Sequence, residues 1–184
     1  MFTQLGDMPE PISNQEIRER QEALHSKFAD GDLLILCSSP ETIHSNDVHH
    51  PYRTQSNLLY LSGWTEPDAV MCSMKVNGKW QTHLFVQPKD TLKEIWEGRR
   101  PGIEGALENW PVDYAHSVDD LQEKLADFIA KSSKILHRMG IMPEVDELVV
   151  KAVKKRDRAR QRYGSGPISI EDPSNLIAEM RLIK

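Results

Sequence analysis

Residues 32–38 read DLLILCS, a run of five consecutive apolar side chains between Asp32 and Ser38. The run has the length of a β-strand, but it lacks the alternation of polar and apolar residues that marks a strand with one solvated face. We therefore expect a strand that is covered on both of its faces.

The segments on either side of this run predict a helix before it and a β-hairpin after it. Residues 13–28 begin with a serine three positions before a glutamate, the pattern of a capping box, and continue with apolar residues near helical spacing. Downstream, the strand-like residues 68–76 and 79–88 flank Asn77-Gly78, a strong hairpin signal.

The rest of the chain returns to helices and a further strand. Residues 91–110 predict two short helices around a Gly/Pro loop, 117–132 a helix, 134–140 a short strand and 143–164 a long helix. The order helix, strand, irregular segment, hairpin, helix, strand, helix implies a single α/β domain, built as a mixed sheet with helices on both faces.

The last ten residues place Leu176, Met180 and Ile183 along one face of a helix. The sequence stops on this apolar stripe without a C-cap glycine or a polar tail. We therefore expect residues 173–184 to form a connecting helix whose stripe docks onto polypeptide beyond this sequence. Residues 1–12 are expected to be a disordered or frayed start.

Composition narrows the class of protein. With 184 residues, 39% apolar and 28% charged, the chain suits one globular domain, and its formal charge of −5 gives no reason to expect nucleic acid or a membrane surface as a partner. No apolar run is long enough for a membrane span, and the start is not that of a secretory signal. Cys37 and Cys72 lie in apolar runs, which favours buried free thiols in a reducing cytoplasm; a bridge between them is the alternative.

Histidines in the irregular segment are the first candidates for chemistry. His44, His49 and His50, with Asp47, could be metal ligands, but adjacent histidines point in different directions, and neither HExxH nor a cysteine pair at zinc spacing occurs. Surface or loop-bracing histidines are the other interpretation. The sequence contains no GxSxG, GxGxxG or GxxxxGK[ST] motif, so it indicates neither a hydrolase nucleophile nor a phosphate-binding loop.

Residues 51–63, PYRTQSNLLYLSG, hold a second group of candidates. Arg53 follows a proline-tyrosine corner, where its donors can tie loop carbonyls or a carboxylate together. Ser56-Asn57 can cap the segment that follows. Bracing of the loop and binding of a ligand both fit Tyr52 and Arg53, and the residues alone leave the choice open.

Three motifs, in order, carry a resemblance to a known family: PYRTQSNLLYLSGWTEPDAV at 51–70, EIWEGRRPG at 94–102 and EMRLIK at 179–184. Together they are similar to the N-terminal domain of aminopeptidase P, found in the Xaa-Pro aminopeptidases of the creatinase/prolidase group. The resemblance covers the chain from about residue 13 onward. It implies a mixed, roughly six-stranded sheet flanked by helices over residues 13–172.

The resemblance also implies a larger metallopeptidase around this domain. Full-length members are hydrolases whose second domain holds two divalent metals, usually manganese, and they release the N-terminal residue of peptides with proline at the second position. None of those metal ligands matches a position here, so we expect this chain to hold no catalytic residue, metal or cofactor and to be inactive alone. Its implied partners are its own C-terminal catalytic domain and further copies in a homo-dimer or homo-tetramer.

Domains of this family resemble assembly modules that narrow the entrance to the active site. Trp96, flanked by Arg99 and Arg100, is our candidate for reaching a neighbouring subunit's pocket; packing in the local core is the alternative. The full set of candidates for a substrate pocket or subunit interface is Trp96, Arg99, Tyr52 and Arg53. Two other functions stay open: a stand-alone binding module that has lost its catalytic half, and a hydrolase that uses His49, His50 and Asp47.

Overall fold

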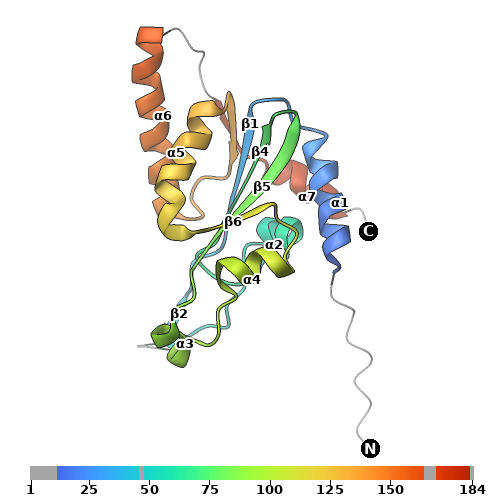
Figure 1. The fold of residues 1–184 in the computed structure, drawn as a ribbon, viewed down its shortest axis with the longest axis vertical. Helices are drawn as coiled ribbons and strands as arrows, with labels where there is room; N and C mark the ends of the chain where they lie inside the picture. The colour runs from blue at the N-terminus through green and yellow to red at the C-terminus, as the bar shows by residue number, and fades with distance from the viewer. Residues whose placement is uncertain (1–11, 46–47, 164–168, 183–184) are drawn as a thin grey trace, which may run out of the picture.

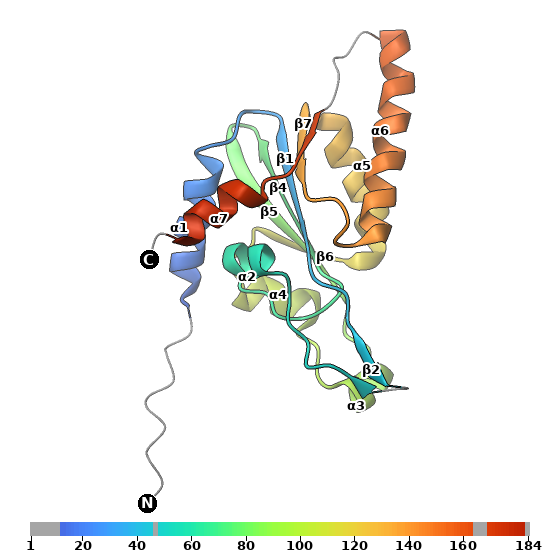
Figure 2. The same cartoon turned by 180° about the vertical axis from the view of Figure 1, so that it is seen from behind.

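The computed structural model of the chain describes residues 12–45, 48–163 and 169–182. A mixed sheet of six strands lies at its centre and carries helices on both faces, as the sequence predicts (Figures 1 and 2). In order across the sheet, the strands are β6 (Tyr114–Ser117), β5 (Lys79–Val86), β4 (Val70–Val76), β1 (Asp32–Cys37), β7 (Lys134–His137) and β8 (Ser169–Glu171).

Two layers of helices cover the sheet. One face carries α1 (Asn14–His25), α2 (Ser56–Ser62), α4 (Gly102–Asn109) and α7 (Ser174–Leu182). The other face carries α5 (Leu121–Lys131), which follows the 3₁₀ turn η1 (Val118–Asp120), and α6 (Pro143–Tyr163). Within the described residues, no helix is both long and apolar enough to cross a membrane.

Strand β1 is the buried strand that its apolar run predicts. All six of its residues are buried, and it pairs antiparallel with β4 and parallel with β7. Leu34 contributes to the core beneath α1, α2, α4 and α7, whereas Leu33 and Ile35 contribute to the core beneath α5 and α6. Successive side chains of one strand therefore supply both hydrophobic layers.

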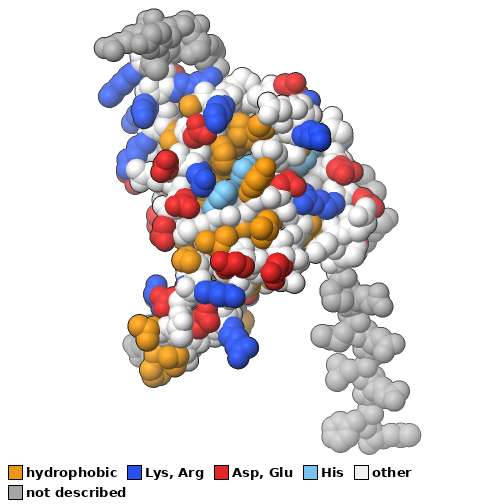
Figure 3. Space-filling view, in the orientation of Figure 1, with side chains coloured by type: hydrophobic (Ala, Val, Ile, Leu, Met, Phe, Trp, Pro, Cys, Tyr) orange, Lys and Arg blue, Asp and Glu red, His pale blue; other side chains and the backbone are white. Residues whose placement is uncertain are grey.

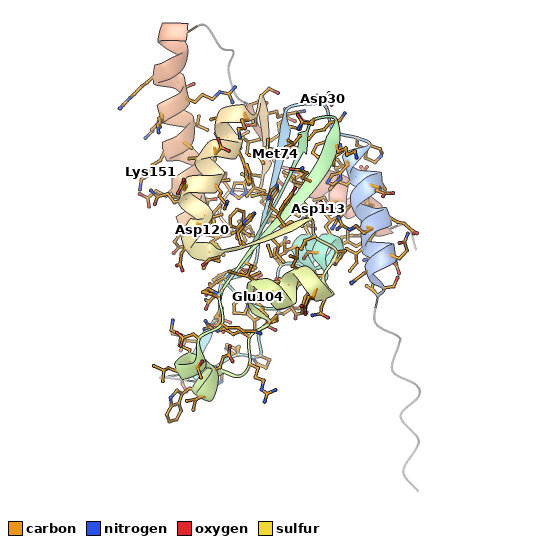
Figure 4. The ribbon with its side chains drawn as sticks, viewed as in Figure 1. Asp30, Met74, Glu104, Asp113, Asp120 and Lys151 are labelled. Carbon is orange, nitrogen blue, oxygen red and sulfur yellow. The ribbon has the colours of Figure 1, made fainter. Side chains whose placement is uncertain are left out.

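The hairpin and the first helix also form as predicted. Asn77 and Gly78 connect β4 to β5 with φ of 52° and 79°, the left-handed conformation that a tight two-residue hairpin requires. Helix α1 begins at Ser13, whose hydroxyl accepts the backbone N–H of Glu16. Asp113 lies between β5 and α1 (Figure 4), where its carboxylate accepts the Thr82 N–H at 2.7 Å and pairs with Arg18 at 3.1 Å.

The structure differs from the sequence-based expectations in four strands and one cap. The segment expected to be irregular contains the ribbon of β2 (Ile43–Ser45) and β3 (Val48–His49), and the edge strands β6 and β8 were not expected. The cap of α2 is Gln55 rather than Ser56-Asn57: its side-chain oxygen accepts the N–H groups of Asn57 and Leu58, at 2.6 and 3.2 Å. Because α2 already begins at Ser56, the glutamine before it is the residue whose side chain reaches the free N–H groups.

The apolar stripe of the final helix docks onto this chain's own core. Ile177 is fully buried and Met180 nearly so, while Leu176 is partly buried against the same core; Ile183 lies outside the described residues. The expectation that this stripe awaits other polypeptide is therefore wrong for its described part. The hydroxyl of Tyr60 in α2 also donates to the Met180 carbonyl at 3.2 Å, which fixes α7 against α2.

Shortening one side chain of β1 should destabilise the whole fold. Leu34 is fully buried, so Leu34→Ala removes apolar contacts and leaves a cavity, at a cost of roughly 2–5 kcal/mol in the free energy of unfolding. Leu107→Ala, at a half-exposed site on α4, is the matched control and should cost less than about 1 kcal/mol. Urea unfolding measures both; equal losses would contradict the central position of β1.

Acid should also weaken the fold through His25, which stacks on Trp80 with ring centroids 4.5 Å apart. Burial lowers the pKa of His25 from 6.5 to about 4, because the imidazolium would lose its hydration there. The unfolded chain takes up this proton as the pH falls below 6.5, and the folded chain does so only near 4. The contribution of His25 to the free energy of unfolding is therefore fully present above pH 6.5 and is lost as the pH falls from 6.5 to about 4. The loss is on the order of 2 kcal/mol.

The measurement is urea unfolding at about pH 7 and about pH 4.5. His25→Phe keeps an aromatic ring on Trp80 and removes the titration, so this variant should lose less stability on acidification than the parent. His50→Phe changes an exposed histidine and should lose as much as the parent. An unaltered acid sensitivity in His25→Phe would contradict the assignment.

Candidate functional site

Most of the candidate residues lie at one end of the molecule, where the ribbon β2-β3 meets α3 (Thr91–Glu97) (Figure 1). A pocket of about 800 Å³ lies there, between the segment after β1, the loop that follows α2 and the segment from α3 to α4. Its charged lining contains three acids and three bases: Glu41, Glu66, Asp68, Lys93, Arg99 and Arg100. Three of the four predicted site residues, Tyr52, Trp96 and Arg99, line this pocket.

Tyr52 has the bracing role that was one of its two predicted roles. Its hydroxyl donates to the Ser39 carbonyl at 3.0 Å and so ties together the two ends of the segment that contains β2 and β3. The ring also lines the pocket. Bracing and contact with a ligand are therefore compatible at this residue.

Arg53 lies elsewhere. It lines a groove between α1, α2 and α7 rather than the pocket of Tyr52, because neighbouring residues in an extended segment face opposite directions. Arg53 is exposed and forms no hydrogen bond or ion pair with any other residue in the described part of the chain. The expected loop contacts of its guanidinium are thus not seen.

Helix α3 presents its apolar side chains to solvent. Trp96 is 88% exposed, Leu92 76% and Ile95 68%, and Ile43 of β2 is 65% exposed nearby. We call these four residues the apolar tip; Figure 3 shows hydrophobic side chains gathered at this end of the molecule. The alternative in which Trp96 fills the local core is wrong. A cluster of large exposed apolar groups is typical of a surface that binds another protein.

The backbone of α3 is capped at its N-terminus and ends at a glycine. Asp90 caps its N-terminus, with a carboxylate oxygen accepting the N–H groups of Leu92 and Lys93 at 3.0 and 3.2 Å. Gly98 follows the helix with φ of 92°, which a side chain would disfavour. The three apolar side chains of α3 are therefore presented on a short helix that is capped at its N-terminus.

The residues considered for metal binding do not form a cluster in the described part of the chain. The rings of His44 and His50 meet edge to face with centroids 4.9 Å apart, while Asp47 and the side chain of His49 lie outside the described residues. No three His, Cys, Asp or Glu side chains among the described residues come together as metal ligands would.

The two thiols are part of the hydrophobic core. Cys37 and Cys72 are buried and unbridged, as predicted, and both belong to the layer beneath α5 and α6. Burial raises the pKa of Cys37 to about 12 and also raises that of Cys72, because a thiolate would lose its hydration. Neither thiol is available as a nucleophile near neutral pH.

Sequence reasoning identified Trp96 but missed the rest of the apolar tip. Leu92, Ile95 and Trp96 are spaced as i, i+3 and i+4, which ordinarily indicates a core-facing helix. One signal could have shown that these residues are exposed rather than part of the core. The charged residues around them, in TLKEIWEGRR, and the shortness of the helix both argue against a buried face. Ile43 carried no signal, because its ribbon was not predicted.

These features define an α/β domain with an exposed apolar tip beside a charged pocket, and the comparison with known proteins gives the family. Residues 17–137 match the family model for the aminopeptidase P N-terminal domain. The chain belongs to this family, as its three motifs predict.

The most similar relatives include enzymes of bacteria. The Xaa-Pro aminopeptidase of Escherichia coli is 30% identical over 177 residues, which are 94% of this chain and 40% of that protein. The structure of proline aminopeptidase P II from Yersinia pestis is 33% identical with a TM-score of 0.85, and covers 94% of this chain and 40% of its own. A zinc-substituted E. coli aminopeptidase P in complex with product is 30% identical with a TM-score of 0.86, over 95% of this chain and 40% of its own. The chain thus spans about two fifths of these proteins.

Removing the cap of α3 should loosen the apolar tip without unfolding the domain. Asp90→Ala deletes the oxygen that satisfies two helix N–H groups, at a cost of about 1 kcal/mol that falls on α3. Amide hydrogen exchange should become faster for residues 92–97 and stay unchanged in β1. Asp90→Ser keeps a capping oxygen and should restore most of the protection. Unchanged exchange in Asp90→Ala would contradict the role of the cap.

Proposed function

We propose that this chain is the non-catalytic N-terminal domain of a manganese-dependent Xaa-Pro aminopeptidase, which removes the residue before a proline. The observation that carries the proposal is the family match over residues 17–137, together with a relative of which the 177 aligned residues make up only 40%. Within that enzyme, the domain mediates contacts between copies and narrows access to the active site. Two buried, unbridged cysteines support a reducing compartment such as the cytoplasm.

The chemistry belongs to the C-terminal domain in this proposal. A structural relative is described as a zinc-substituted enzyme with product bound, which supports a metal in the enzyme as a whole. Since the described acids and histidines of this chain form no ligand cluster, we assign the two metal ions, and the bond cleavage, to the catalytic domain.

The apolar tip supports the assembly role. Four large apolar side chains on a projecting helix and ribbon would gain on the order of 1 kcal/mol or more each on burial in a partner. We propose that the partner is a second copy of the enzyme, in a homo-dimer or homo-tetramer, and that Trp96 is the anchor. Arg99 and Tyr52, which line the adjacent pocket, are then placed at the rim of this contact.

The test is Trp96→Ala in the full-length enzyme. Because Trp96 is almost fully exposed within the domain, its removal should leave the thermal unfolding midpoint unchanged. Loss of an anchor costs roughly 2 kcal/mol or more of association energy, which weakens assembly about thirtyfold. Sedimentation at falling concentrations should show earlier dissociation, and cleavage of an Xaa-Pro peptide should fall with it.

Leu107→Ala is the matched control, an exposed apolar residue on α4 outside the apolar tip. It should change neither the assembly nor the cleavage rate. If Trp96→Ala retains both the mass of the parent assembly and its peptide cleavage, the assembly role is wrong. If the full-length parent cleaves no Xaa-Pro peptide at all, the proposed enzyme class is wrong.

A further inference from the structure

A cleft between α1 and the hairpin of β4 and β5 lies apart from the apolar tip and its charged pocket. Figure 1 shows α1 beside this hairpin, and the cleft between them shares no lining residue with the charged pocket. Its volume is about 740 Å³, within the range of sites that bind small molecules. We call it the hairpin cleft.

Aromatic rings form part of the wall of the hairpin cleft. Trp80 is partly exposed, and its ring stacks on His25 with an interplanar angle of 11°, while Phe28 packs against the same indole with centroids 5.9 Å apart. His25 is 7% exposed, and its Nε2 has no hydrogen-bond partner among the described residues. Native structures rarely leave a buried nitrogen without a partner, so this wall differs from an ordinary core surface. The wall offers apolar area whose orientation is already fixed by packing.

Two ion pairs flank the aromatic wall. Arg18 of the cleft pairs with Asp113 at 3.1 Å, and Lys75 of the cleft pairs with Asp30. Figure 4 shows Asp30 near the tip of the hairpin and Asp113 farther along β5, so the two pairs lie toward opposite ends of the cleft. Both cations are therefore already neutralised by carboxylates of the chain itself.

Two further charges of the hairpin cleft remain unpaired within the described part of the chain. Glu22 lines the cleft from α1 and Lys79 lines it from the hairpin, and both are exposed. Neither side chain forms an ion pair or a hydrogen bond with another described residue. His25 adds no charge near neutral pH, because burial lowers its pKa to about 4. The cleft thus presents one negative and one positive group, on opposite walls, beside an aromatic surface.

This arrangement selects a ligand by its charges. A zwitterion with an apolar body satisfies both free charges and the aromatic wall at once. A ligand that carries phosphate groups would meet one free cation and the repulsion of Glu22, and a neutral sugar would leave both charges unpaired.

We propose that the hairpin cleft binds an apolar α-amino acid or a short apolar peptide with free termini. Its ammonium group lies at Glu22, its carboxylate at Lys79 and its side chain against Trp80. The proposal goes beyond the proposed function and does not require it. In an Xaa-Pro aminopeptidase, such a ligand belongs to the same chemical class as the substrate and the products, so the cleft is a second site for that class, outside the catalytic domain.

The experiment is a titration of the full-length protein labelled with 5-fluorotryptophan. Its readout is the fluorine resonance of Trp80, identified as the signal that is lost in Trp80→Phe. The probes are L-leucine and leucyl-leucine, each compared with its amide, which lacks the carboxylate, and with its N-acetyl derivative, which lacks the ammonium group. At least one of the two zwitterions should shift the Trp80 signal saturably, and its amide and N-acetyl forms should each bind at least about threefold more weakly.

The comparison of L-leucine with leucyl-leucine identifies the ligand. Tighter binding of L-leucine assigns the cleft to free amino acids, and tighter binding of leucyl-leucine assigns it to peptides. No shift of the Trp80 signal with either zwitterion would overturn the proposal. Equal affinity for the zwitterion and its two singly charged derivatives would also overturn it.

Neutral variants test the two charged contacts one at a time. Glu22→Gln should abolish the preference for the zwitterion over its N-acetyl form, and Lys79→Met should abolish the preference over the amide, because each removes one ion pair. The matched controls are Glu19→Gln, on α1 outside the cleft, and Lys154→Met, on α6; both residues are exposed. These controls should keep both preferences, and unchanged preferences in Glu22→Gln and Lys79→Met would contradict the assigned contacts.

Cleavage of an Xaa-Pro peptide by the same preparation tests the proposed function separately. An active enzyme whose Trp80 signal does not respond refutes the amino-acid site alone. A protein that binds the zwitterion but cleaves no Xaa-Pro peptide refutes the proposed enzyme class alone.

Discussion

The complete burial of β1 is the constraint on which the rest of the structure depends. This strand joins an antiparallel half of the sheet, through β4, to a parallel half, through β7, and supplies apolar side chains to both helical layers. A strand with apolar side chains on both faces requires both helical layers, because each layer removes the side chains of one face from water. The helices α1, α2, α4 and α7 on one face, and α5 and α6 on the other, follow from that requirement.

The same strand also sets where the binding surfaces lie. Strands β1 and β5 are both antiparallel to β4, so they run in the same direction and their carboxyl ends lie at the same end of the sheet. The chain leaves β1 to form the ribbon β2-β3 and leaves β5 to form α3, and the two excursions together build the apolar tip and its charged pocket. The surface that we assign to assembly therefore extends from strand ends that are buried, although its own side chains are exposed.

Sequence patterns predicted the elements that depend mainly on interactions between residues close together in the chain. The apolar run of β1, the Asn77-Gly78 turn and the Ser13 cap each fix their structure through neighbouring residues. Strands β6 and β8 are short, polar and partly exposed, so they form through pairing with a neighbouring strand and have no strong pattern of their own. At the site, the family motifs identified Tyr52 and Trp96. They did not show that Tyr52 and Arg53 line different surfaces, because this depends on tertiary packing that sequence spacing does not reveal.

In the proposed function, this chain binds a second copy of the enzyme, and the metal chemistry lies in the catalytic domain. The most direct test is the intact mass of the natural gene product. Since the chain spans about two fifths of its relatives, the proposed function predicts a polypeptide more than twice the 21.0 kDa of this chain. A natural product of 21.0 kDa, with no further domain attached, would contradict it.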